Sequence, residues 1–405
     1  MKTVIICISD PYMIRGRQLR EYYQKRRDEA LILTPDFSHR KKQRITEAEE
    51  AVILIPHLAY RKNLSISRML GHYLFSQKCL RVLEDLQPDR IHCLIPANSL
   101  AAAMKRYKQR HPAVELIFDV QDLWPESFPV PFLKHIPGYG IWKRMRTASI
   151  DAADHIAAEC EFYRSKIGSQ NPGRITTLFW SQKDWPADRT ACLDSDEIHL
   201  AYLGSMNHIL DIASISELLR NLSARKKTVL HLIGRGEKKD ELVRELTGID
   251  NLVLVDHGEI YDGRKKQEIF NRCRFGINLM KSHIQVGLSM KSIDYLQGGL
   301  PVINSLSGDL HTLIEQENAG FNLPPDPDGK ISETAGRILG QSENEHMKMR
   351  KNARELYERH FSAEAFEETL DQMLDQDGMS AAGKENRHSV YTTEKLKVGE
   401  TDDQF

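Results

Sequence analysis

Short apolar runs rich in Val, Ile and Leu alternate with longer, helical patterns along most of the 405-residue chain. Many of these runs are apolar at every position, which is typical of parallel strands covered on both faces. Two neighbouring parallel strands must be joined by a crossover connection, and the helical segments between the strands can form these connections. A polar, turn-rich segment at 181–197 divides the series in two. The alternation therefore predicts an α/β protein with two Rossmann-like, doubly wound domains.

The predicted strands fall into two groups, one on each side of that segment. Those of the first group are 3–9, 30–34, 51–56, 90–95, 115–120 and 175–179. Those of the second group are 199–203, 229–233, 252–255, 275–279 and 301–304. The clearest predicted helices are 17–25, 66–86, 97–110, 213–224, 264–272, 289–297 and the closing helices at 345–375.

These elements predict a first domain at 1–182, a linker at 183–197 and a second domain at 198–345. Closing helices follow at 346–376, and residues 377–405 are predicted to form a disordered tail, because they lack apolar periodicity. Ligands bind at the carboxyl ends of the strands in open parallel sheets. We therefore expect the site in a cleft where two such edges face each other.

Charge is distributed unevenly, although the net charge is only -1. Residues 1–180 carry a net charge of roughly +9 and the remainder roughly -10, counting Lys and Arg against Asp and Glu. A basic half fits a nucleic acid, an anionic membrane surface or an anionic substrate, and also an ordinary solvated surface. Nucleic acid is the weakest candidate, because no aromatic residues are interleaved with the basic ones.

The chain shows no export signal. No apolar run approaches the ~20 residues that span a bilayer, and the first residues lack a signal-peptide cleavage pattern. The six cysteines show no metal-site or CxxC spacing, which suits a reducing compartment. We expect a cytoplasmic protein whose first domain contacts the inner face of the plasma membrane peripherally.

The most informative segment is GLSMKSIDYLQGGLPVIN at 287–304. Its first residues would open a helix whose free N–H groups hold a diphosphate, namely Gly287, Leu288, Ser289 and Met290. Lys291 would add a positive charge in the first turn, and Asp294 would accept hydrogen bonds from ribose hydroxyls. From the residues alone, an exposed Lys291–Asp294 pair between helix-capping glycines fits equally well.

This segment resembles the donor-binding helix of the family 4 glycosyltransferases, which have the GT-B fold. In that family an acidic residue is followed by apolar residues and then G-x-P-V. Asp294, Gly299, Pro301 and Val302 match that register. The segments YLGS at 202–205 and HLIGRGEKKDEL at 231–242 resemble the first strand-and-loop units of the family's second domain.

DLWPES at 122–127 resembles the first-domain cleft motif of a branch of this family that builds surface polysaccharides. His257 and Gly258 resemble the loop that faces the nucleotide base. The order and spacing of these motifs, over about residues 1–370, carry the resemblance. It implies that further donor-binding residues lie after the strands of the second domain: Gly204, Ser205, Arg235, Gly258 and Lys281.

The chain departs from the family pattern at three places. Val286 stands where the family often has the first of two Glu residues, and Gln121 stands where it commonly has His. The loop 205–208, SMNH, lacks the cations that often neutralise the diphosphate. The compensating charge would have to come from Lys281, Lys291 or Arg235.

Asp122 and Glu126 are the predicted catalytic carboxylates, together with Lys291. They follow strand 115–120 in a segment rich in proline and glycine, where a carboxylate can act as a base or bind a sugar hydroxyl. Capping of the loop is the alternative for either residue. Gly16 and Arg17, after the first strand, are the predicted acceptor-side residues, with a solvated helix start as the alternative.

No metal or other cofactor is expected. Two segments imitate a metal-binding DxD motif, 194–196 and 326–328, but both are turn-rich and lie away from a strand end. The chain has neither a P-loop lysine nor zinc-site spacing. The resemblance likewise implies a reaction that needs no metal.

We therefore predict a glycosyltransferase that moves a sugar from a nucleoside diphosphate sugar to a glycan or lipid-linked glycan. The resemblance implies retention of the anomeric configuration and a role in capsule, exopolysaccharide or O-antigen biosynthesis. Two alternatives remain: a GT-B-fold sugar-nucleotide epimerase and a non-catalytic nucleotide-sugar-binding protein. Gln121, Val286 and the uncharged 205–208 loop favour the non-catalytic alternative, and the intact 287–304 segment opposes it.

Overall fold

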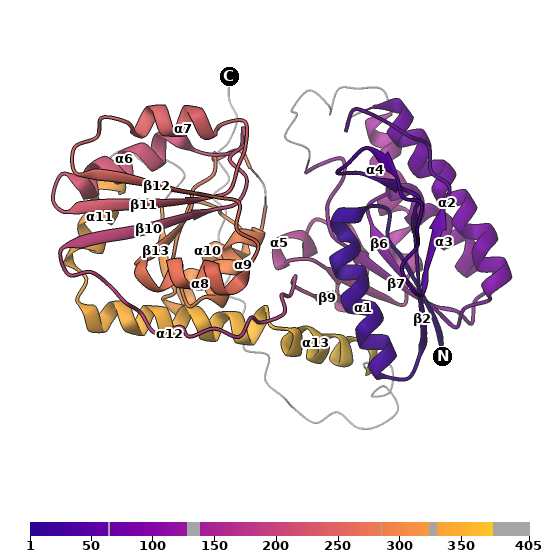
Figure 1. Cartoon of the computed structure of the whole chain (residues 1–405). Helices are drawn as coiled ribbons and strands as arrows, with labels where there is room; N and C mark the ends of the chain where they lie inside the picture. The colour runs from indigo at the N-terminus through magenta and orange to yellow at the C-terminus, as the bar shows by residue number, and fades with distance from the viewer. Residues whose placement is uncertain (64, 128–137, 285, 324–329, 376–405) are drawn as a thin grey trace, which may run out of the picture.

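The computed structural model describes residues 1–63, 65–127, 138–284, 286–323 and 330–375. The chain forms two α/β domains side by side, each built on its own parallel sheet (Figure 1). The predicted tail at 377–405 and the DxD-like segment at 326–328 lie outside the described residues. In the part that is described, no helix is both long and apolar enough to cross a bilayer.

The first sheet has the strand order β5-β2-β1-β6-β7-β8-β9, and every neighbouring pair is parallel. Its strands are β1 (Lys2–Ile6), β2 (Glu29–Pro35), β5 (Val52–Ile55), β6 (Arg90–Ile95), β7 (Glu115–Val120), β8 (His155–Ala158) and β9 (Ile175–Thr177). Its helices are α1 (Met13–Lys25), α2 (Ile66–Leu86), α3 (Asn98–Arg110), α4 (Tyr139–Thr147) and α5 (Glu161–Arg164). A small antiparallel hairpin, β3 (Phe37–Ser38) and β4 (Gln43–Arg44), follows β2.

The second sheet has the order β12-β11-β10-β13-β14-β15 and is also parallel throughout. Its strands are β10 (Glu197–Leu203), β11 (Lys227–Ile233), β12 (Leu252–Gly258), β13 (Phe275–Asn278), β14 (Val302–Asn304) and β15 (Gly320–Asn322). Its helices are α6 (Ile212–Ser223), α7 (Lys239–Leu246), α8 (Gly263–Arg272), α9 (Met290–Gln297), α10 (Asp309–Glu317) and α11 (Lys330–Gly340). In both sheets the strand order reverses beside the first strand of the domain, which is the topological switch point of a doubly wound fold.

Local sequence signals set several helix ends. Ser65 caps α2 by accepting a hydrogen bond from the Arg68 N–H, and Gln87 ends that helix in a left-handed conformation. Ser342 and Glu345 form a capping box at the start of α12 (Glu343–His360). Such caps satisfy backbone N–H groups that the helix leaves without partners.

The C-terminal helices join the two domains. Helix α12 packs against α9 and α10 of the second domain, and α13 (Ala363–Asp375) then lies beside α1 of the first domain (Figure 1). Phe366, Leu370 and Met373 of α13 belong to the apolar core beneath α1. The Tyr22 hydroxyl also donates a hydrogen bond of 2.7 Å to Asp371. The chain therefore crosses between the domains twice.

One predicted boundary was wrong. The sequence predicted a loop through Gly16 and a helix from Arg17, whereas α1 begins at Met13. A short 3-10 turn at Asp10–Tyr12 replaces the rest of that loop. Gly16 therefore lies inside the helix, facing Cys7 and Ile32 of the sheet, and a glycine at a helix–sheet contact had been read as a loop signal.

Candidate active site

Glycine loops lie close together at the carboxyl edge of the second sheet. Gly204 follows β10 and Gly234 follows β11, both with positive φ. A Cβ on Gly234 would clash with the Gly204 carbonyl, and one on Gly236 would clash with the Met206 carbonyl. Only glycine allows this approach together with these backbone angles. The two loops therefore form a backbone shelf beside the start of α9.

The start of α9 is built around Ser289, which is its N-cap. Its hydroxyl accepts from the Ser292 N–H and donates to the Asn278 side chain at the end of β13. No described residue accepts a hydrogen bond from the N–H of Met290 or Lys291. The Ser289 side chain thus has a structural role, whereas the first-turn N–H groups are available to an anion. Leu288 is part of the core instead.

Lys291 lies partly buried between α9 and the Gly204 loop. Its Nζ donates to the Tyr202 hydroxyl at 3.1 Å and lies 4.4 Å from the centre of the Tyr202 ring. A Cβ on Gly204 would lie 3.9 Å from the Lys291 side chain. Burial lowers the pKa of Lys291 to about 7, because a charged ammonium loses hydration without a carboxylate to replace it. A bound diphosphate would supply that missing negative charge.

Asp294 points away from Lys291. One of its carboxylate oxygens accepts from Lys266 of α8 at 2.6 Å, and the Lys266 ammonium lies 4.6 Å from the centre of the Trp185 ring. Burial raises the pKa of Asp294 above its ordinary value. The Lys291–Asp294 ion pair, one of the two sequence-based alternatives, does not form. The second oxygen of Asp294 is the group that would meet a ribose hydroxyl.

The other predicted donor-side residues lie on loops at the same edge. The Arg235 side chain is 79% exposed and contacts Glu259 at 3.1 Å. Ser205 is exposed, and its carbonyl accepts from the Tyr202 hydroxyl. Lys281 follows β13 and is exposed. Gly258 ends β12 and accepts from the Gly234 N–H, which ties a third loop to the glycine shelf.

Gly287 lies at the contact between the domains. A Cβ on Gly287 would lie 2.6 Å from the Cys160 sulfur and 2.7 Å from an Asp309 carboxylate oxygen. Asp309, at the start of α10, accepts from the N–H groups of Glu161 and Phe162 at 2.6 and 2.9 Å. A carboxylate of the second domain therefore caps α5 of the first. Cys160 follows β8 of the first sheet, whereas Gly287 and Asp309 follow β13 and β14 of the second sheet. The carboxyl edges of the two sheets therefore meet here.

Asp122 follows β7 at the carboxyl edge of the first sheet. One carboxylate oxygen accepts from its neighbour's N–H, that of Leu123, and the other accepts from the Trp124 indole at 2.8 Å. Burial raises the pKa of Asp122 above its ordinary value. A carboxylate with a raised pKa at a strand end is suited to proton transfer.

Glu126 is engaged in an ion pair. Arg146 of α4, which is completely buried, donates to both Glu126 oxygens, at 2.7 and 3.2 Å. Lys143 lies 3.2 Å from the same carboxylate. The two-pronged pair fastens the loop after β7 to α4. The structure thus supplies a structural role for Glu126, whose catalytic role stays a prediction.

Glu159 was missed by the sequence analysis. It directly follows β8, beside Cys160 at the domain contact. Burial raises the pKa of Glu159 well above its usual range, and the charge of Asp122 raises it further. Burial therefore favours the neutral form of this carboxyl group. The signal that could have found it is a carboxylate immediately after a strand of a parallel sheet.

The acceptor-side predictions fall on α1. Arg17 forms a two-pronged ion pair with Glu49, so its charge is already matched. Arg15 is completely buried and donates to Asp119 at 2.9 Å and to the Phe179 carbonyl at 2.7 Å. Arg15 thus anchors α1 to β7 and the chain after β9. Neither Gly16 nor Arg17 lies beside Asp122 in any contact that the described residues show.

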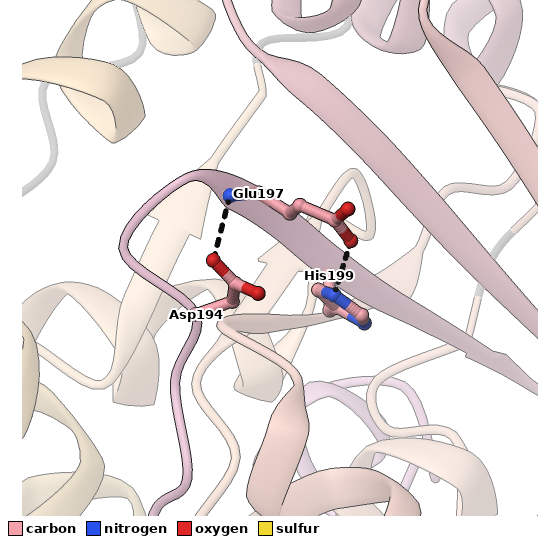
Figure 2. A group of neighbouring side chains, drawn as sticks. All are labelled: Asp194, Glu197 and His199. Carbon is pink, nitrogen blue, oxygen red and sulfur yellow. Dashed lines mark hydrogen bonds and ion pairs between the residues drawn. The ribbon is translucent and has the colours of Figure 1, made fainter.

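A group of potential metal ligands lies at the opposite edge of the second sheet. Ligand atoms of Asp194, Glu197 and His199 lie within 4.8 Å of one another (Figure 2). Asp194 accepts from the Asp196 and Glu197 N–H groups, and Glu197 contacts Lys227 and His199. Each of these side chains therefore has a hydrogen-bonding or ionic partner nearby. The group lies at the amino end of β10, whereas the glycine shelf lies at the carboxyl end of the same strand.

A row of histidines crosses the same sheet. His199, His231 and His257 are hydrogen-bonded in series at 2.9 Å, with ring centres 5.2 Å apart. Burial and the neighbouring imidazoles lower the pKa of His231 to about 4. His257 therefore belongs to a row of stacked, hydrogen-bonded imidazoles across β10, β11 and β12.

Comparison with known families gives a match over the second domain. Residues 197–341 match the family described as Glycosyl transferases group 1. This range includes the glycine shelf, α9 and Asp309. A search of curated protein sequences finds no match.

Solved structures match over both domains. The lipopolysaccharide outer core galactosyltransferase WaaB has a TM-score of 0.67 at 13% identity, covering 93% of this chain and 100% of its own. Sucrose-phosphate synthase from Thermosynechococcus elongatus has a TM-score of 0.67 at 15% identity, covering 94% and 100%. HepE from Anabaena, in complex with UDP, has a TM-score of 0.64 at 11% identity, covering 93% and 100%.

The predicted fold is confirmed: the chain has two Rossmann-like domains in the GT-B arrangement of these glycosyltransferases. The family match over the second domain, together with this shared fold, supports the predicted glycosyltransferase enzyme.

Proposed function

We propose that this protein transfers a sugar from a nucleoside diphosphate sugar to a hydroxyl of a glycan or lipid-linked glycan. The observation that carries the proposal is Lys291, a partly buried ammonium beside the start of α9 and the Gly204 loop, with which no carboxylate of the described residues forms an ion pair. An anionic group is what such a site lacks. HepE, which shares the fold, is described in complex with UDP and with UDP-glucose.

In this proposal the second domain holds the donor. The N–H groups of Met290 and Lys291 and the Lys291 ammonium bind the diphosphate, and the free oxygen of Asp294 accepts from the ribose. As the sugar leaves, negative charge grows on the diphosphate, and these groups stabilise it in place. Arg235, being 79% exposed at the same edge, adds charge when a ligand is present.

The first domain supplies the acceptor side. Asp122 stands at the strand end with a raised pKa, where it takes or orients the proton of the attacking hydroxyl. Burial and the charge of Asp122 raise the pKa of Glu159, and in this proposal its protonated form donates a hydrogen bond beside Asp122. We propose retention of the anomeric configuration and no metal requirement, as the family resemblance implies.

The acceptor in this proposal is lipid-linked, and the pathway is that of a capsule, an exopolysaccharide or an O-antigen. The DLWPES motif and the basic first domain support it. WaaB and WaaG, both of similar fold, are described as lipopolysaccharide transferases. The protein would act in the cytoplasm, with its first domain against anionic lipid.

A panel of nucleoside diphosphate sugars tests the proposal. A ligand that binds only the folded protein must raise its melting temperature. We expect at least one donor to do so and to be consumed when a lipid-linked acceptor is added. Donor binding with conversion of the sugar but no transfer would favour the epimerase. Binding without any turnover would favour the non-catalytic protein, which the cation-free 205–208 loop also fits.

A further inference from the structure

The solvent-facing side of α2 is apolar along its N-terminal half. Ile66, Met69, Leu70, Tyr73 and Leu74 are between 38% and 85% exposed, with Ile66 the most exposed. Their spacing places them in one stripe of the helix. The opposite stripe, with Phe75, Cys79 and Leu83, is buried in the core. The N-terminal half of α2 therefore exposes an apolar stripe where an ordinary surface helix is polar.

Helix α2, which carries this apolar stripe, lies on the side of the first domain that is away from the second domain (Figure 1). The C-terminal half of the same outer face is polar, with Gln77, Arg81 and Asp85. The apolar character is thus confined to one patch. Covering this patch would remove its apolar side chains from water, which is favourable.

Cations surround the N-terminal end of the patch. A pocket of about 550 Å³ lies there, lined by Phe37, Lys42, Tyr60, Arg61, Lys62 and Ser65, among others. Lys42, in the β3–β4 turn, donates to the Asn63 side chain at 2.6 Å, which joins that turn to the start of α2. Segments 37–46 and 57–83 contain no carboxylate at all. None of Arg40, Lys41, Lys42, Arg61 and Lys62 has an ion pair within the described part of the chain.

We infer that the apolar stripe of α2 inserts into the surface of an anionic lipid bilayer, with the pocket at its N-terminus against lipid phosphates. The inference rests on the proposed function, for which it supplies the docking surface. An apolar helix face bordered by Lys and Arg is the pattern of an interfacial helix. A second copy of the chain fits less well, because a twofold contact over this stripe would bring two carboxylate-free cationic clusters together.

The surface is connected to the candidate active site by stacked rings. His72 of α2 stacks on Trp124 at 5.8 Å between ring centres, and the Trp124 indole donates to Asp122. Arg68 of α2 lies 4.7 Å from the centre of the same Trp124 ring. A helix in the bilayer surface would therefore hold the Asp122 loop next to the leaflet that carries a lipid-linked acceptor.

The test places an environment-sensitive fluorophore on the stripe. Cys192 is the exposed cysteine among the six, so Cys192→Ser gives the background. Met69→Cys then carries the label on α2, and Met347→Cys on α12 is the matched control, since these methionines are 43% and 42% exposed. Both labelled proteins are mixed with phosphatidylcholine vesicles that contain or lack phosphatidylglycerol.

We expect a blue shift and a several-fold rise in emission at position 69 with anionic vesicles, and neither change at position 347. Ile66→Ser with Leu70→Ser should lower the vesicle partition coefficient by at least about tenfold, because two large apolar side chains lose their burial in the bilayer. Arg61→Ser with Lys62→Ser should weaken binding and reduce its dependence on salt.

Equal responses at positions 69 and 347 would overturn the inference. So would a label at 69 that is already blue-shifted without vesicles in a protein that sediments as a dimer, since a second copy would then cover the stripe. Donor-induced melting shifts of the same variants keep the two proposals apart. A variant that loses vesicle binding but keeps the donor-induced melting shift supports the docking surface without affecting the proposed transferase function. A parent protein that binds vesicles but shows no donor-induced shift would contradict the transferase function and leave the docking surface supported.

Discussion

At the residue scale, the candidate site contains ionisable side chains whose pKa values are shifted far from their ordinary values in the absence of ligand. Lys291 lacks a carboxylate and has a pKa of about 7, whereas Glu159 has its pKa raised by burial and by Asp122. Both lie at carboxyl edges of the sheets. Groups perturbed in this way at a ligand edge are typical of functional sites.

Lys291 makes donor affinity depend on pH. A bound diphosphate favours the ammonium, so binding takes up a proton once the pH exceeds about 7. We expect the affinity for a bound nucleoside diphosphate to fall by up to about tenfold per pH unit between pH 7 and pH 9. Titration calorimetry in buffers of different ionisation enthalpy measures both the affinity and the proton uptake.

Lys291→Arg is the control, because its guanidinium stays charged throughout this range. It should flatten the pH dependence. A parent protein whose affinity is constant from pH 7 to pH 9 would remove Lys291 from the donor site.

Glu159 makes the stability of the folded protein depend on pH. Burial lowers the pKa of Lys291, whereas it raises the pKa of Glu159. Its folded-state pKa is raised, so its contribution is favourable below the unfolded pKa and is lost as the pH rises toward the folded value. Glu159→Gln should therefore leave the melting temperature unchanged near pH 4 and raise it, relative to the parent, at pH 8. Glu161→Gln, at an exposed site, should show no such difference. A Gln variant less stable than the parent at pH 8 would mean that Glu159 is ionised.

At the element scale, the contact between the domains is a helix cap supplied by the other domain. Asp309 accepts from two N–H groups at the start of α5. Asp309→Ala should expose those amides and speed hydrogen exchange in a peptide covering 155–167. Each of the two charge-assisted bonds that are lost contributes about 1.5–3 kcal/mol. Asp211→Ala is the control, since Asp211 caps α6 within its own domain. Unchanged exchange in Asp309→Ala would show that this contact does not hold the domains together.

Much of the element pattern was predictable from the sequence. Helix α2 begins and ends where its periodicity predicts, because Ser65 and Gln87 are local signals. Three short elements, β3, β4 and β15, were not predicted, since none of them lies in a run of apolar residues like those that marked β9 and β14. Asp309 could not be recognised as an interdomain cap, because its partners lie 148 and 147 residues away. The charge state of Glu159 likewise follows from burial, which only the fold provides.

At the scale of the whole molecule, the C-terminal helix is a brace between the domains. Helix α13 fills the core beneath α1 with Phe366, Leu370 and Met373. Truncation after Ser362 should lower the melting temperature by several degrees, as three buried side chains are lost. Truncation after Asp375 keeps α13 and should leave the melting temperature and donor binding unchanged. Equal melting temperatures for both truncations would contradict the bracing role.

The division of labour between the domains, donor on the second and acceptor chemistry on the first, is the central claim. Asp122→Asn tests it most directly, since it removes the ionisable group while its amide oxygen can still accept from the Trp124 indole. The second accepted bond, from the Leu123 N–H, is lost. The measurement is the transfer rate to an extracted lipid-linked acceptor, together with the donor dissociation constant, for parent and variant. We predict a rate lowered by about 10²–10⁴-fold with donor affinity unchanged. An undiminished rate, or a loss of donor binding that accounts for the whole fall in rate, would contradict it.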